Sequence, residues 1–162
     1  MKNFLLSMFI CAVFIACEKE EETTPADNSN PSASCGERKI CFDLNDTAYT
    51  NAVFMYKLDD STYFAKYESN GVQLSIDWIT QTPKTGTFPA GSVKMEGKSR
   101  IYYFPGRNVM WMSQSGEVEI TKHEGKTVSA TFSGTLEKIV NGSPNGETLI
   151  VKNGVFTNGI YN

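Results

Sequence analysis

The stretch "VSATFSGTLE", residues 128–137, decides the fold class, because apolar or small residues occupy every second position. The stretch "VQLSIDW", residues 72–78, alternates in the same way, with Gln73, Ser75 and Asp77 on the face opposite its apolar residues. Successive side chains of a β-strand point to opposite faces, so a period of two predicts strands with one face in a core and the other in water. No long stretch has the periodicity of a helix.

Turn residues punctuate the chain at intervals of about ten residues. Asn-Gly pairs among them favour the positive φ angles of tight hairpins. The sequence therefore predicts an all-β domain of about ten short antiparallel strands, arranged as a β-sandwich or a small β-barrel. Two longer connections, residues 80–91 and 141–146, fit crossings between sheets. The predicted turn pairs are Asp59-Asp60, Asn70-Gly71, Glu96-Gly97, Pro105-Gly106, Ser115-Gly116, Glu124-Gly125 and Asn153-Gly154.

The N-terminus has the pattern of a secretory signal peptide, in which a positive charge precedes a short apolar stretch. This stretch, residues 4–16, is shorter than the roughly 20 residues that a bilayer-spanning helix needs. It resembles the bacterial lipobox, in which a small residue, here Ala16, precedes the cysteine that is lipidated, here Cys17. Cys11 follows a bulky residue and is the poorer candidate. We predict a lipoprotein signal peptide over residues 1–16 and fatty-acyl chains, such as palmitate, on Cys17.

The residues directly after Cys17 are acidic, with one lysine among four glutamates over residues 18–22. They resemble the surface-export signal of lipoproteins from Bacteroidetes-type bacteria. The alternative is a solvated charge run that only begins a flexible tether. The export interpretation predicts a protein that is held on the outer membrane by its lipid, faces the cell exterior and does not cross the bilayer.

The chain divides at Cys35 into a predicted lipidated tether, residues 17–34, and a predicted globular domain, residues 35–162. Residues 18–34 contain no Val, Ile, Leu or aromatic residue, so they cannot bury enough apolar surface to offset the entropy of ordering. The domain holds 13 acidic and 13 basic residues, so its charge is balanced. A balanced domain gives no basis for binding nucleic acid, which needs a basic patch.

Cysteine usage predicts one disulfide. Two of the four cysteines remain once Cys11 leaves with the signal peptide and Cys17 is acylated. The remaining Cys35 and Cys41 would pair in an oxidising compartment. Their spacing has no second cysteine pair and no clustered histidine, so a metal site is the weaker interpretation. We expect a structural disulfide at the start of the domain.

The C-terminal third contains "GEVEITKHEGKTVSATFSGTL", residues 116–136, and "ETLIVKNGVFTNGIY", residues 147–161. These two segments resemble a family of uncharacterised surface lipoproteins from Bacteroidetes-type bacteria. Members carry a Gly-x-Val-x-Ile-Thr strand, a Val-Ser-Gly-Thr-Phe-like strand and a final Asn-Gly-x-Phe strand; here Ala130 replaces the usual glycine. The resemblance implies an all-β lipoprotein. The family has no established activity, so the resemblance implies no functional residues.

Catalytic motifs are not apparent in the sequence. His123 is the only histidine and lies beside the Glu124-Gly125 pair, where we expect an exposed loop residue. No Gly-x-Ser-x-Gly elbow, His-Glu-x-x-His motif or phosphate-binding glycine loop occurs. Paired carboxylates could hydrolyse glycosides without a histidine, but no pair is marked by its context. We therefore predict a protein that is not an enzyme and holds neither a cofactor nor a metal.

The stretch "IYYFPGRNVMWM", residues 101–112, has the most functional potential. Tyr102 and Tyr103 must point to opposite faces of a strand, so one of them lies away from the core unless both faces are covered. Aromatic faces suit the apolar faces of sugar rings, and arginine and glutamine supply hydrogen bonds. The alternative is that these aromatic side chains fill a β core with their polar tips at its rim. The candidate ligand-binding residues are Tyr102, Tyr103, Arg107 and Trp111, with Arg100 and Gln114 as further hydrogen-bonding groups.

Three function classes remain open from the sequence. The first is a noncatalytic domain that binds a glycan or another envelope ligand, and we expect this function. The second is an accessory or structural subunit of an outer-membrane complex, which would have an envelope protein as its partner. The third is a small hydrolase with unmarked carboxylates. An exposed coplanar aromatic group would favour the first class, a large apolar patch with a polar rim the second, and a cleft with two close acids the third.

Overall fold

The computed structural model describes residues 35–106 and 108–162. Within those residues the chain forms ten β-strands and no helix, so the all-β prediction is confirmed. The predicted signal peptide, the tether and Cys17 lie outside the described residues. The strands are β1 (Lys39–Leu44), β2 (Thr47–Ala52), β3 (Phe54–Lys57), β4 (Thr62–Ser69), β5 (Val72–Ile79), β6 (Gly86–Pro89), β7 (Ser99–Gly106), β8 (Val109–Glu124), β9 (Thr127–Val140) and β10 (Ser143–Ile160).

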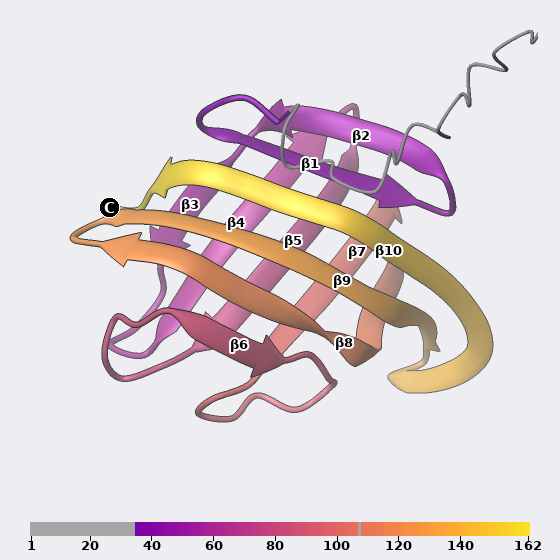
Figure 1. Cartoon of the computed structure of the whole chain (residues 1–162). Coiled ribbons are helices and arrows are strands. Elements are labelled where there is room, and N and C mark those ends of the chain that lie inside the picture. Colours follow the sequence, from indigo (N-terminus) through magenta and orange to yellow (C-terminus); the bar gives the residue numbers. More distant parts are fainter. Residues whose placement is uncertain (1–34, 107) are drawn as a thin grey trace, which may run out of the picture.

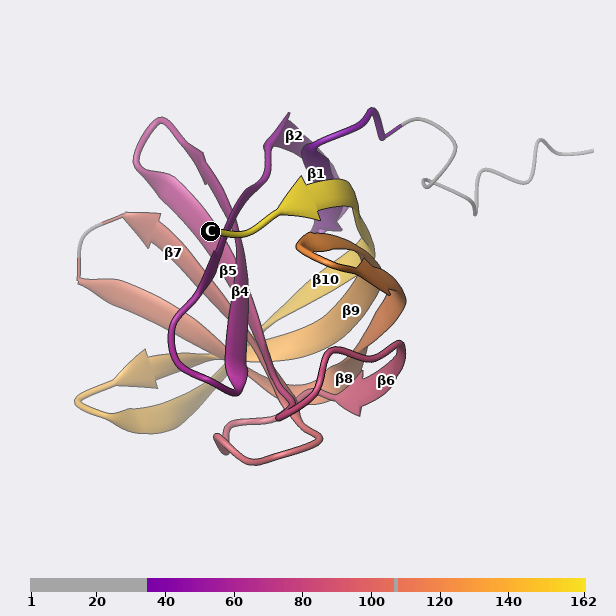
Figure 2. The same ribbon diagram turned by 90° about the vertical axis from the view of Figure 1, so that its left-hand side faces the viewer.

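The strands form one antiparallel sheet in the order β2-β1-β10-β9-β8-β7-β5-β4-β3, and β6 pairs with β8 beside this path. The sheet curls, so that β1, β10, β9 and β8 pass in front of β3, β4, β5 and β7 (Figure 1). Turned by 90°, the same two layers enclose the interior between them (Figure 2). One face of every strand can therefore contribute to a single core.

The two ends of the sheet come together and nearly close it into a barrel. Val53 alone separates β2, at one end of the sheet, from β3, at the other. Met55 of β3 forms a parallel bridge with Tyr161, directly after β10. Asn51 Nδ2 of β2 donates a hydrogen bond to the carbonyl oxygen of Glu68 in β4, at 2.7 Å. The sequence left a sandwich and a barrel open; the structure is barrel-like.

Three strands are longer than expected from the turn pattern. β8, β9 and β10 have 16, 14 and 18 residues. The pairs Ser115-Gly116 and Asn153-Gly154, which predict turns, instead lie inside β8 and β10, where the register of the strand pairing shifts. A β-bulge uses the same special backbone angles as a turn, and it bends the strand without ending it. These bulges let the three long strands follow the curvature of the barrel.

The predicted alternation is confirmed on the inner face. Leu74, Ile76 and Trp78 of β5 are completely buried, as are Val128, Ala130 and Leu136 of β9. The Trp78 ring stacks on Tyr63 at a centroid distance of 5.5 Å and on Phe156 at 6.1 Å, so aromatic packing joins the two layers of the barrel. The largest fully buried side chains are Trp78, Tyr63, Phe42, Phe88, Phe156, Ile40, Leu74, Ile76, Ile101, Ile120, Leu136 and Val118.

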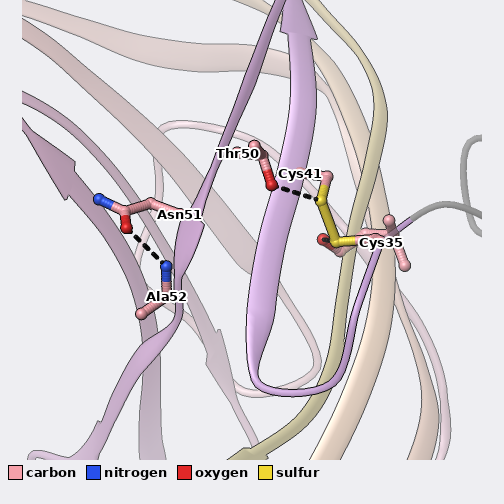
Figure 3. The surroundings of a disulfide bond; sticks show 6 residues. Cys35, Cys41, Thr50, Asn51 and Ala52 are labelled. Carbon is pink, nitrogen blue, oxygen red and sulfur yellow. Dashed lines mark hydrogen bonds between the residues drawn. A yellow bond between two sulfur atoms is a disulfide. The ribbon is translucent and has the colours of Figure 1, made fainter.

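The predicted disulfide between Cys35 and Cys41 is present, with the two Cα atoms 5.9 Å apart. It ties the start of the domain to β1, next to the Thr50 hydroxyl of β2, which lies 3.1 Å from Cys41 Sγ (Figure 3). Cys35 is buried, and its Sγ also lies 3.8 Å from the Val155 carbonyl oxygen of β10. The bond therefore holds the first described residues against the barrel.

Candidate functional site

The most distinctive surface of the barrel is the outward face of β3, β4, β5 and β7, the side turned away from β8–β10 in Figure 2. Two aromatic pairs lie on it, one on β3 and β4 and the other on β7, with polar residues of β5 between them. We call this surface the outer aromatic face. It consists of Phe54, Tyr56, Phe64, Lys66, Glu68, Gln73, Ser75, Asp77, Arg100, Tyr102 and Phe104.

Strand alternation and register place these residues together. Tyr63 and Ile101 point into the core, so their neighbours Phe64, Arg100 and Tyr102 point outward. The antiparallel pairing then aligns outward side chains in rows that cross the strands. One row contains Tyr56, Phe64, Asp77 and Arg100, and the next contains Phe54, Lys66, Ser75, Tyr102 and Met112.

The first aromatic pair is open to solvent. The Tyr56 and Phe64 rings are stacked with their centroids 4.9 Å apart and their planes 7° from parallel. Tyr56 is 41% exposed, and Phe54, next to it on the outward face of β3, is 56% exposed. Because the two stacked rings cover each other's inner faces, the apolar surface left for a ligand is the exposed part of Tyr56 and the neighbouring Phe54.

The second aromatic pair, Tyr102 and Phe104, is half-buried. The Tyr102 and Phe104 rings stack at a centroid distance of 6.4 Å and an interplanar angle of 22°. The Arg100 guanidinium lies over the Tyr102 ring, 5.2 Å from its centroid. Burial raises the pKa of Tyr102 to about 12, although the charge of Arg100 acts in the opposite direction. Tyr102 is therefore a neutral hydrogen-bonding group at physiological pH.

An ion pair lies between the two aromatic pairs. Arg100 Nε donates to both Asp77 carboxylate oxygens at 3.1 Å, and Arg100 Nη2 also donates to Asp77 Oδ2. Asp77 is completely buried, whereas the Arg100 side chain is 17% exposed. Burial alone would lower the pKa of Arg100, but the hydrogen bonds to Asp77 and its charge raise it above its ordinary value. This pair corrects the sequence interpretation that placed Asp77 in water, because Arg100 covers it.

The remaining polar groups of this face are also paired with one another. Gln73 Nε2 donates to Ser75 Oγ at 2.7 Å, within β5. Lys66 Nζ, in the row of Phe54, lies 2.6 Å from Glu68 Oε2. The face therefore holds two cations, Lys66 and Arg100, each beside a carboxylate, so its charges balance.

A hollow of about 350 Å³ lies next to this face. Lys98 and Gln114 line it: Lys98 directly precedes β7, two residues before Arg100, and Gln114 lies in β8, two residues after Met112. Its other lining residues come from the end of β6 and from the connection between β6 and β7, including the exposed Val93 and Met95. The lining residues include no carboxylate, so this hollow has no acid–base pair of the kind that glycosidases use.

The sequence-predicted ligand residues divide between the two faces of the barrel. Tyr102 belongs to the outer aromatic face. Tyr103 and Trp111 are register partners on the inner face and are buried in the core, with 6% and 9% of their surface exposed. Burial raises the pKa of Tyr103 to about 12. Arg107 lies outside the described residues.

Sequence reasoning missed the first aromatic pair, Tyr56 and Phe64. Phe54, Tyr56 and Leu58 alternate with Met55 and Lys57, which is a period-two signal in a short segment. The outward position of the larger side chains could not be read from this signal, because it needs the register with Phe64 in β4. Both faces of β3 carry apolar residues, so alternation alone does not say which one is buried.

His123 is not the exposed loop residue that the sequence suggested. It lies within β8, is half-buried, and packs edge-on against Tyr63 at a centroid distance of 5.1 Å. Its Nε2 lies 3.2 Å from the Tyr161 hydroxyl oxygen. No group of three or more His, Cys, Asp or Glu side chains among residues 35–106 and 108–162 could hold a metal ion.

Comparisons with known proteins define no relatives. No family model, no curated protein and no solved structure matches the chain. The resemblance to Bacteroidetes-type lipoproteins therefore stays a prediction. The part of the chain that the structure describes has no helix long and apolar enough to cross a membrane.

Proposed function

We propose that this chain is a lipoprotein, anchored in the outer membrane through Cys17, whose barrel binds an extracellular glycan on the outer aromatic face without transforming it. The observation that carries the binding proposal is the stacked pair of Tyr56 and Phe64, of which Tyr56 is exposed, across β5 from a second aromatic pair on β7. Sugar rings present C–H groups that pack on such π surfaces, and buried polar groups nearby fix their orientation.

Exchange of Tyr56 tests the binding function. Tyr56→Ala removes an exposed ring that contributes little to the core, so the domain should stay folded. Loss of a stacking contact is worth about 0.5–1.5 kcal/mol, so glycan affinity should fall up to about tenfold. Glycan-array screening would identify the ligand and calorimetry would measure its affinity.

Ile150→Ala is the matched control, because Ile150 is 47% exposed on β10, away from the outer aromatic face. It should leave affinity unchanged. Equal affinities for the wild type and Tyr56→Ala would contradict the assignment of this face. Turnover of a glycan by the purified protein would contradict the noncatalytic part of the proposal.

The anchor is tested independently. Growth with a labelled fatty acid should label the wild-type protein and leave Cys17→Ala unlabelled, because Cys17 follows Ala16 at the end of the apolar stretch. A label that persists in Cys17→Ala would refute lipidation at this residue.

An accessory subunit of an envelope complex is the second candidate function. The exposed side chains of Phe54, Tyr56 and Leu58 follow one another along β3 and its turn, and such a stripe also suits a protein partner. A partner captured from envelope extract by the wild type, and lost with Tyr56→Ala, would favour this function if no glycan binds.

A further inference from the structure

The two aromatic pairs are separated by one whole strand. Phe64 on β4 and Tyr102 on β7 flank β5, which pairs with both strands. Neighbouring strands lie about 4.7–4.9 Å apart, so the pairs are roughly 9–10 Å apart across the sheet, and the register also offsets them along the strands. A single ring stacked over one pair therefore leaves the other pair uncovered.

The strip between the pairs is suited to hydroxyl groups. It is formed by the short polar residues Gln73, Ser75 and Asp77 of β5, with Arg100 beside Asp77. Asp77 and Ser75 are buried below the level of the flanking rings, whereas Gln73 is half-buried. A ligand that crosses the strip meets amide and guanidinium donors between two apolar surfaces.

Charge balance excludes a strongly anionic ligand from this strip. The Arg100 guanidinium is already engaged by Asp77, and Lys66 by Glu68. A carboxylate or sulfate group on the ligand would find both cations beside protein carboxylates, which repel it. Lys98 is exposed but lies in the neighbouring hollow, beyond the aromatic pairs.

Resting on the proposed glycan-binding function, we infer that the ligand is a charge-neutral oligosaccharide of at least two rings that lies across β4, β5 and β7. One ring packs on Tyr56 and Phe64, another packs on Tyr102 and Phe104, and the part of the oligosaccharide between these two rings crosses the polar strip of β5. The ligand therefore crosses the strands obliquely, because Tyr56 and Phe64 lie in one row of outward side chains and Tyr102 lies in the next.

Calorimetric titration of the mature chain with neutral gluco-, manno- and galacto-oligosaccharides of one to six rings tests this inference. The best series should bind roughly tenfold or more tightly once its length spans both pairs, because the second contact is then intramolecular. Oligogalacturonates of equal length should bind more weakly. Tyr56→Ala should remove the gain with length, whereas Ile150→Ala should retain it.

The outcomes separate this inference from the proposed function. Failure of every saccharide to bind counts against glycan binding itself, and with it against the inference. Binding in which a monosaccharide equals the longer ligands, or in which the uronates bind more tightly, overturns the inference and leaves glycan binding standing. A gain with length that Tyr56→Ala retains also overturns it, because the two rings would then rest elsewhere.

Discussion

Asp77 is completely buried on the outward face of a strand, a position that normally faces water. Its charge is tolerated because Arg100 covers it with a forked set of hydrogen bonds and in turn lies over Tyr102. A buried ion pair is costly to form and costly to break from one side. We therefore infer that the Asp77–Arg100 ion pair holds the Tyr102 and Phe104 rings in place.

A double-mutant cycle measures the coupling energy between Asp77 and Arg100. Arg100→Met leaves the Asp77 carboxylate buried without its partner, and Asp77→Leu leaves Arg100 uncompensated. Each single change should lower the free energy of unfolding by about 3–5 kcal/mol. The double variant replaces the pair by apolar groups, so it should lose much less than the sum of the two. Urea denaturation of the four proteins gives the coupling energy.

An additive result would contradict the pairing. It would mean that Asp77 and Arg100 stabilise the sheet through separate contacts. The Lys66–Glu68 pair serves as a comparison, since its side chains are 25% and 55% exposed. Exposed pairs contribute about 0.2–1 kcal/mol, so Lys66→Met should have a small effect.

Among the elements, the strands were predictable and their lengths were not. Alternation around Leu74 and Ala130 specifies buried faces locally, and both faces are found. The pair Ser115-Gly116 has the same local signal whether the chain turns or bulges. A Cβ at Gly116 would lie 2.2 Å from the Ser133 carbonyl oxygen, so glycine is needed there for the close approach of β8 and β9. The neighbouring strand β9 imposes this requirement, so the residues next to Gly116 in the sequence do not reveal it.

Local sequence patterns also predict the candidate site only in part. Alternation places Tyr102 and Tyr103 on opposite faces, and the structure has them so. It could not identify Tyr103 and Trp111 as the buried pair, because β7 carries aromatic residues on both faces. Tyr56 comes beside Phe64 only through the register of β3 with β4. The site therefore depends on strand pairing, which brings together residues from β3, β4, β5 and β7.

On the scale of the whole molecule, closure of the barrel depends on the C-terminus. Tyr161 bridges Met55 of β3, and its backbone nitrogen donates to the Lys126 carbonyl oxygen between β8 and β9. Its hydroxyl donates to the Gly125 carbonyl oxygen at 2.9 Å. That hydroxyl oxygen can then accept from His123 Nε2, so the hydrogen bonds fix the neutral histidine with its proton on Nε2. The histidine is thus part of the contact that closes the sheet.

Protonation of His123 would oppose this closure. Its Nδ1 is buried and has no hydrogen-bond partner among the described residues. Burial, and then the charge of Lys57 on β3, lower the pKa of His123 below its ordinary value of 6.5. The other groups around it are the Tyr63 ring of β4 and the Lys122–Glu124 pair of β8. None of these groups accepts a hydrogen bond from Nδ1 in the structure.

The barrel should therefore lose stability as the pH falls below about 6.5. In that range the unfolded chain binds a proton at His123 while the folded chain does not, and protonation favours unfolding by at most about 1.4 kcal/mol per pH unit. The loss begins at the unfolded pKa and levels off below the lowered folded pKa. His123 is the only histidine, so His123→Gln, which keeps an N–H donor for Tyr161, should flatten the profile between about pH 7 and pH 5. Urea denaturation at closely spaced pH values measures both profiles. The same slope in both proteins would show that other groups titrate there and that His123 does not report on closure.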